Sequence, residues 1–159
     1  PVNSLDADVS YQSSDHVRFL VHKDNLSVTA VGFPTKMENQ PDTPILLPET
    51  GEVLDCIFRF CYPERHPDLS TLDFEIFSQI ADTAEKYKVF AAMNVCNIQM
   101  NKTLPHHATE VLVYAAKHDY QKLLMKTAQL VMDIPLPKIL PLLPSYLVVP
   151  WVYWTLTNI

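Results

Sequence analysis

The chain opens with two short segments, 8–12 and 17–22, in which apolar and polar residues alternate. A period of two is typical of a strand with one buried face. The polar tetrapeptide 13–16 between them suits a turn. We therefore expect a β-hairpin here, and the apolar run 45–47, which lies between two prolines, is a candidate third strand.

After the hairpin, apolar residues recur at intervals of three and four, which is the period of a helix with one buried face. Helices are expected in the segments 23–33, 50–62, 70–84, 93–100, 105–115 and 119–131. Candidate helix starts are Thr50, a capping box of Ser70 with Asp73, Pro105 and Asp119. A brief extended piece is expected at 87–89, between the third helix and the fourth.

The segment 134–154 is the most apolar stretch, and it is long enough to suggest a membrane span. It contains five prolines and Lys138. Each proline removes a backbone donor, and lipid offers no replacement partner for the groups left unpaired. We therefore prefer a packed tail and expect no membrane association. Strands first and paired helices afterwards predict an α+β fold dominated by helix.

Composition narrows the classes of function. The 159 residues suffice for one core, and a formal charge of −6 with 12 scattered Lys and Arg residues lacks the cationic face that nucleic acid requires. The two glycines cannot form a three-glycine dinucleotide fingerprint, and no phosphate-binding loop is present, so no cofactor is expected. Cys56, Cys61 and Cys96 lie in apolar helical patterns. This favours buried, reduced thiols and an intracellular protein, in the cytoplasm or the nucleus.

The residues that bind metals or act as nucleophiles form no recognisable constellation. The six histidines make no HxH or HExxH motif, and we expect structural or solvated roles for them, with His22 packing and hydrogen bonding at the end of the strand pair. Apolar residues surround Cys56 and Cys61, whereas a nucleophilic thiol needs a base and an electropositive setting. We expect no metal site and no catalytic residue. A small hydrolase that uses a histidine with a cysteine or serine is the alternative from the class of enzymes.

The order and spacing of several motifs point to a family. The segments 17–33 (VRFLVHKDNLSVTAVGF), 53–62 (VLDCIFRFCY) and 72–100 resemble the BTB/POZ domain. In that domain a strand pair is followed by a histidine, a basic residue, a leucine, a small hydroxyl residue and a phenylalanine. The corresponding residues are His22, Lys23, Leu26, Thr29 and Phe33. The stretches 61–69 and 114–118 are similar to BTB proteins that are abundant in fungi.

The resemblance implies a BTB/POZ domain over 5–102, with a short three-stranded sheet flanked by paired helices. Residues 103–159 would form a helical, BACK-like extension packed on it. The implied function is non-enzymatic protein–protein contact, by self-association or as an adaptor. The alternative within this class is a substrate adaptor that recruits a cullin-based ubiquitin ligase, docking through the helix after Pro67 and the helices after Thr103. Self-association would give a homodimer, although only seven residues precede Asp8, where self-pairing members usually carry an additional helix.

Two sets of residues are candidate binding sites. Asp8 and Lys23 match an acidic and a basic residue that form a charged pocket in the transcription-factor members of the family. Their simpler interpretation is two solvated charges, one at a strand start and one in a first helical turn. A row of exposed apolar residues would make a partner or dimer interface, and its candidates are Val9, Tyr11, Val28 and Val31. The alternative for this row is that its members belong to the core.

Overall fold

The computed structural model describes residues 6–35 and 43–157, and it is an α+β structure dominated by helix, as the sequence predicts. The chain divides into two compact units, Pro1–Asn97 and Ile98–Ile159. The division falls within helix α4 (Phe90–Lys102), whereas the resemblance places the end of the first domain at residue 102. The domain bounds 5–102 and 103–159 stay predictions.

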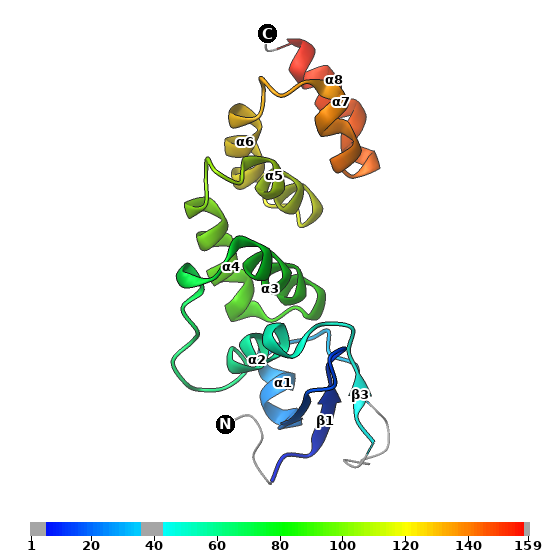
Figure 1. Cartoon of the computed structure of the whole chain (residues 1–159), viewed down its shortest axis with the longest axis vertical. Helices are drawn as coiled ribbons and strands as arrows, with labels where there is room; N and C mark the ends of the chain where they lie inside the picture. The colour runs from blue at the N-terminus through cyan, green and yellow to red at the C-terminus, as the bar shows by residue number, and fades with distance from the viewer. Residues whose placement is uncertain (1–5, 36–42, 158–159) are drawn as a thin grey trace. The chain divides into compact units, whose positions relative to one another are not determined.

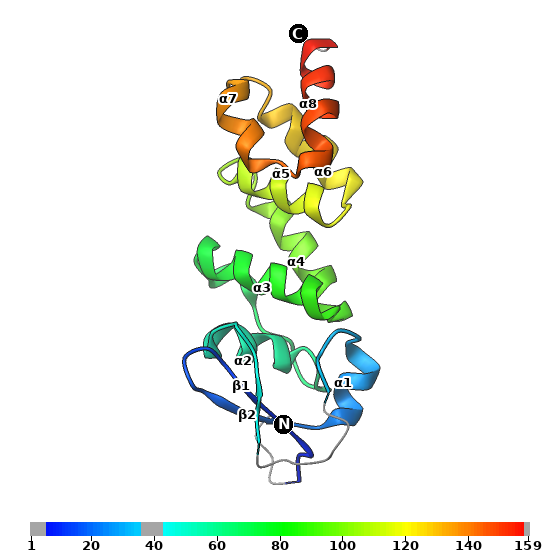
Figure 2. The same ribbon diagram turned by 90° about the vertical axis from the view of Figure 1, so that its right-hand side faces the viewer.

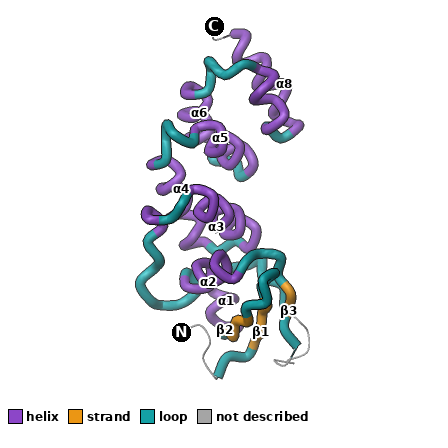
Figure 3. The backbone as a smooth tube through the Cα atoms, in the orientation of Figure 1, coloured by secondary structure: helices purple, strands orange, loops and turns teal. Residues whose placement is uncertain are grey.

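Among the described residues, three short strands form a sheet in the first unit, with the order β2-β1-β3. Strand β1 (Val9–Gln12) pairs antiparallel with β2 (Arg18–Val21), and Tyr11 lies opposite Phe19. Strand β3 (Ile45–Leu46) pairs parallel with the other edge of β1. The predicted hairpin and third strand are therefore both present (Figure 3).

The helices of the first unit are α1 (Lys23–Thr29), α2 (Gly51–Arg59), α3 (Phe74–Tyr87) and α4, with a 3₁₀ turn η1 (Leu69–Thr71) before α3. Helix α2 contacts β2 and α3, so the sheet, α2 and α3 are stacked as layers (Figure 1, Figure 2). The apolar stripe predicted for α2 is buried, since at most 1% of each of its central residues is exposed. These residues are Val53, Leu54, Ile57 and Phe58.

An aromatic stack joins the segment after α1 to α3. The ring of Phe33 lies nearly parallel to that of Tyr87, with centroids 4.3 Å apart, and it also stacks on Phe58 at 5.3 Å. The two backbones approach closely because Gly32 has no side chain: an added Cβ would lie 2.7 Å from the Cα of Tyr87. The Gly32 N–H also donates to the Tyr87 carbonyl at 2.9 Å. This anchoring ends α1 at Thr29, so the helix is shorter than predicted.

The predicted capping box of Ser70 with Asp73 does not start α3. The Asp68 carboxylate accepts a hydrogen bond from the Ser70 N–H at 2.9 Å, and a 3₁₀ turn forms there instead. Asp73 is the N-cap residue of α3. The prediction was wrong because Asp68, two residues earlier, competes for the same stretch of backbone.

The segment 87–89 was predicted to be extended, and this is also wrong. Lys88 adopts the left-handed conformation, with φ of 52°. The Val89 N–H then donates back to the Ala84 carbonyl at 2.9 Å, which closes the C-terminus of α3. The apolar Tyr87 and Val89 that suggested a strand are buried on either side of this turn.

After the end of α4, the regular elements among the described residues of the second unit are helices. They are α5 (Ala108–Lys117), α6 (Gln121–Leu130), α7 (Leu136–Ile139) and α8 (Ser145–Thr157), with a 3₁₀ turn η2 (Leu140–Leu142) before α8. Helix α5 packs on α6. Helix α5 begins three residues after Pro105, and the N-cap residue of α6 is Tyr120 rather than the predicted Asp119, whose φ of 59° is left-handed.

The apolar tail packs within the second unit, as predicted. Ile139, Leu143 and Trp151 are buried in one cluster with Leu112 of α5 and Val131, just after α6. Among the described residues, no helix combines the length and the apolar character that crossing a bilayer requires. The prolines that precede α8 separate this part of the tail into short elements that can fold over the core, whereas Pro150 lies inside α8.

Candidate interaction surfaces

Two of the predicted interface residues are strongly exposed. The exposed fraction is 80% for Val28 and 74% for Val31. Between them Ala30 is buried, and the following Gly32 and Phe33 fix the segment against α3. A fixed backbone loses little entropy on binding, so an apolar pair presented in this way suits contact with a partner. The predicted exposure is confirmed for both valines, and their role in an interface stays a prediction.

Tyr11 belongs to the core, so its assignment to the exposed row is wrong. Its side chain is 0% exposed, and its hydroxyl donates to the Pro34 carbonyl at 3.0 Å. Phe58 of α2 covers the face of the hairpin that carries Tyr11 and Phe19, with ring centroids 5.5 and 5.3 Å away. Burial raises the pKa of Tyr11 well above its ordinary value. Val9 is half-buried and offers little apolar surface.

Asp8 and Lys23 do meet, through the backbone of Lys23. The Asp8 carboxylate oxygen Oδ1 accepts a hydrogen bond from the Lys23 N–H at 2.7 Å. Lys23 is the first residue of α1, where backbone N–H groups have no partner within the helix, and a negative charge interacts favourably with the helix dipole. Both side chains are exposed. The contact is therefore a helix cap supplied by Asp8, the residue just before β1, and the charged pocket stays a prediction.

Asp15 caps α2 in the same manner, and sequence reasoning missed it. Its Oδ1 accepts hydrogen bonds from the Ser13 hydroxyl and, at 2.8 Å, from the N–H of Gly51, the first residue of α2. These bonds, that of Ser13 foremost, lower the pKa of Asp15. Thr50 is the N-cap residue, as predicted, but its side chain makes no capping hydrogen bond. A carboxylate in a turn carries no sequence signal for the distant helix that it caps.

His22 has the structural role that the sequence predicts. The Tyr62 hydroxyl accepts a hydrogen bond from the His22 N–H at 3.0 Å, and it lies 3.0 Å from the ring nitrogen Nδ1 of His22. The other ring nitrogen, Nε2, lies 3.3 Å from the Asp6 carboxylate. In the part of the chain that the structure describes, no three His, Cys, Asp or Glu residues are grouped to hold a metal ion.

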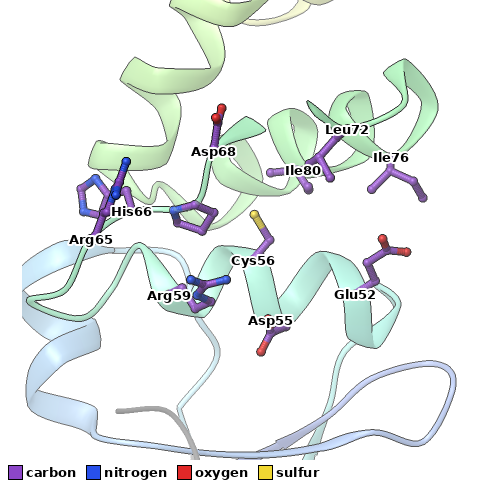
Figure 4. A pocket seen from close by; sticks show the side chains of 11 residues that line it. Glu52, Asp55, Cys56, Arg59, Arg65, His66, Asp68, Leu72, Ile76 and Ile80 are labelled. Atoms are coloured by element: carbon purple, nitrogen blue, oxygen red, sulfur yellow. The ribbon is translucent and has the colours of Figure 1, made fainter. Parts of the chain in front are cut away.

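An open groove of about 430 Å³ lies between α2, α3 and the loop before η1. Arg59, Arg65 and His66 gather towards one end, and Leu72 and Ile76 lie towards the other (Figure 4). Carboxylates of α2 and of the loop also line it; they belong to Glu52, Asp55 and Asp68. Charges of both signs next to aliphatic groups suit a protein segment better than a phosphate group, which the nearby carboxylates would repel.

Cys56 faces this groove, so its prediction as a core cysteine is wrong, whereas Cys61 and Cys96 are at most 1% exposed, as predicted (Figure 4). Cys56 lies on the side of α2 that borders the groove and remains half-buried. Its partial burial raises the pKa of its thiol to about 11. Because the thiolate is the reactive form, Cys56 is a weak nucleophile at neutral pH, although His66 lines the same groove.

Comparison with known proteins assigns no family. No model of a known protein family matches the chain, and no curated protein matches its sequence. The likeness to the BTB/POZ domain therefore rests on the motifs of the sequence.

Proposed function

We propose that this chain is a non-enzymatic protein-interaction module of the BTB/POZ type with a BACK-like helical extension. The order of elements supports the proposal: a hairpin, α1, a third strand beside β1, and then α2 and α3 layered on the sheet. This is the short sheet with paired helices that the family resemblance implies. An intracellular location is part of the same proposal. One fold can serve many functions, so the fold alone does not establish binding. The support for binding has to come from particular surface residues.

The observation that carries the proposal is the pair Val28 and Val31. A single exposed valine on a protein surface is ordinary. Here two exposed valines are three residues apart, in a segment held by the close backbone contact of Gly32 with Tyr87 and by the ring stack of Phe33. Covering both valines would remove apolar surface from water with little ordering of the chain. We therefore assign them to the contact with a protein partner.

Two partners agree with this assignment, a second copy of the chain and a cullin. The groove between α2 and α3 favours the cullin, because Pro67 lines it and the face predicted for cullin docking starts there. Its cationic end and its aliphatic end offer charge pairing and apolar contact to one segment of a partner. The module would then be a substrate adaptor of a ubiquitin ligase.

The hydrolase alternative has weaker support. Cys56 and His66 line one groove, which is the arrangement that a thiol hydrolase would need. The pKa of Cys56 is raised to about 11, however, whereas a catalytic thiol has a lowered pKa. We therefore retain binding as the whole activity.

The proposal is tested by binding of the purified chain to a purified cullin and by the solution mass of the chain alone. The test variant carries Val28→Asp with Val31→Asp, and the matched control is Leu46→Asp, since Leu46 of β3 is 73% exposed. We expect the double variant to weaken the complex at least tenfold, as loss of central apolar contacts does, and the control to bind as the wild type. Absence of both a complex and self-association up to about 100 µM would contradict the proposal.

A further inference from the structure

Helix α8 is apolar on two opposite faces. Its inner face is buried at Trp151 and Thr155, each 8% exposed. Its outer face carries large apolar side chains that are 63% to 76% exposed; they belong to Tyr146, Val149, Tyr153 and Leu156. Of these, Tyr146 also has a contact within its own unit, because its hydroxyl donates to the Ala116 carbonyl of α5 at 2.7 Å. We call these four residues the outer seam. Most surface helices cover one apolar face and turn a polar one to water, so a second apolar face is an unusual feature.

The outer seam has the spacing of a helix that pairs with another helix. Its residues follow one another at intervals of three, four and three, which are the a and d positions of a heptad pattern. In this register Trp151 takes the f position, the one farthest from the seam. The burial of Trp151 against its own unit is therefore consistent with a seam that faces outward.

The charge pattern of α8 fits a second copy of the same helix. The segment 145–157 contains no Asp, Glu, Lys or Arg. Residues at the e and g positions, which usually select partners by charge, are Ser145, Pro150, Val152 and Thr157. Two copies of α8 can thus meet without repulsion between like charges and without burial of an unpaired charge. A strongly charged partner helix would leave its charges without complements.

An apolar groove adjoins the seam. It has a volume of about 380 Å³ and lies between α6 and α8, with Leu124 and Met125 on one side and Pro150 and Trp154 on the other. Tyr153 belongs both to the groove lining and to the outer seam, so the two surfaces are continuous. Met125, at the edge of the groove, is 61% exposed. A helix laid along the seam would cover part of this groove as well.

We infer that α8 is a self-association surface on which the outer seam of one chain pairs with the outer seam of a second copy. The four seam side chains expose on the order of 400 Å² per chain, to which the groove adds. This is below the roughly 800 Å² per partner of a standard interface, so the dimer is weak and depends on concentration. The inference rests on the second unit alone and is independent of the proposed role of Val28 and Val31.

The test exploits the symmetry of pairing between identical chains. One variant carries Val149→Lys with Tyr153→Lys, and the other carries Val149→Glu with Tyr153→Glu. Whether the helices pair parallel or antiparallel, each variant alone places like charges across the seam, and an equal mixture places opposite charges there. A matched control carries two lysines at exposed positions of the same unit outside the seam and the groove, Leu130→Lys with Leu142→Lys.

Sedimentation of the full chain from about 1 µM to about 1 mM measures the outcome. We expect the wild type and the control to dimerise at the high end and each charged variant to dissociate at least tenfold more readily. We expect the mixture, with one variant fluorescently labelled, to form dimers again. A wild type that stays monomeric throughout overturns the inference, as does a dimer that the charged variants leave unchanged. A mixture that fails to dimerise also overturns pairing of α8 with a second copy.

Two further readouts separate this result from other causes. The seam positions 149 and 153 are exposed, so the variants should keep the circular dichroism spectrum of the wild type. The variant with Val28→Asp and Val31→Asp should dimerise through α8 as the wild type does. If that variant alone abolishes the dimer, self-association occurs through the first unit, and the inference for α8 is wrong while the proposed function stands.

Discussion

The carboxylate of Asp15 accepts a hydrogen bond from the backbone N–H of Gly51, with 2.8 Å between Oδ1 and N. The contact links the hairpin turn to the first residue of α2, 36 positions later in the chain. Asp8 makes the equivalent contact with Lys23 at the start of α1. The hairpin thus supplies a carboxylate to each of the next two helices and fixes where they begin.

Asp15 should contribute a stability that depends on pH. Because its pKa is lowered in the folded chain, the contribution is present above the ordinary pKa of 3.8 and is lost as the pH falls through the folded value. Asp15→Ala should therefore lower the melting temperature at pH 7, and the difference from the wild type should vanish in strong acid. Asp133→Ala, at an exposed carboxylate of the second unit, is the control. A difference between Asp15→Ala and the wild type that is constant from pH 7 to about pH 2 would contradict the cap.

Gly32 should tolerate a methyl group less well than Gly51. A Cβ on Gly32 would lie 2.7 Å from a backbone atom, the Cα of Tyr87, and 2.8 Å from the Lys86 carbonyl oxygen. A Cβ on Gly51 would meet only the side chain of Val17 within 3 Å, and Val17 is partly exposed. Gly32→Ala should thus lower the free energy of unfolding by about 1–3 kcal/mol, and Gly51→Ala by less. Urea denaturation measures both, and equal losses would refute the close approach at Gly32.

Tyr11 and Val28 should differ sharply in their effect on stability. Tyr11 is fully buried beneath Phe58, so Tyr11→Ala should cost about 3–5 kcal/mol. Val28→Ala should change the free energy of unfolding by no more than about 0.5 kcal/mol, because the side chain is already in water. The pair separates core from surface within the predicted interface row. Similar losses of unfolding free energy for both substitutions, measured by denaturation, would contradict the assignment of Tyr11 to the core and Val28 to the surface.

The Cys56 thiol should react slowly at neutral pH. With a pKa of about 11 in place of the ordinary 9.0, it has about 100-fold less thiolate than an ordinary cysteine. Its rate of alkylation, followed by peptide mass mapping, should rise about tenfold per pH unit from pH 7 to 10. Fast alkylation at pH 7 that levels off near pH 8 would reveal an activated thiol and favour the hydrolase alternative.

The sequence predicts the elements of the fold but not all of their ends. Alternation at 8–12 and 17–22 marks the hairpin, and intervals of three and four mark the helices, because burial of one face imposes these periods. Helix ends depend on rival caps. Ser70 and Asp73 have the spacing of a capping box, yet Asp68 bonds to the Ser70 backbone and shifts the helix start. Which of two capping residues binds the backbone depends on their relative free energies, and a sequence motif does not give these.

The exposure of a side chain was predictable only where other residues of the same segment show which side of that segment is buried. Leu26, Ala30 and Phe33 define the inner side around α1, so Val28 and Val31 had to face outward. Alternation in the hairpin separates two faces but does not show that α2 covers the face of Tyr11. Helix α8 is apolar all round, so apolar residues at heptad spacing lie on more than one of its faces, and the sequence does not show which face is the outer seam. Its two faces become visible only when burial is known.

Light scattering tests binding by this chain most simply, through the solution mass of the chain alone and in a mixture with a purified cullin. We expect a complex with the summed mass of the two proteins, which is lost when Val28 and Val31 are both replaced by Asp and is kept with Leu46→Asp. This result would show that the chain binds the cullin through the surface of Val28 and Val31. If the chain is monomeric alone up to about 100 µM and both proteins keep their own masses in the mixture, the assignment as an interaction module of this type is contradicted.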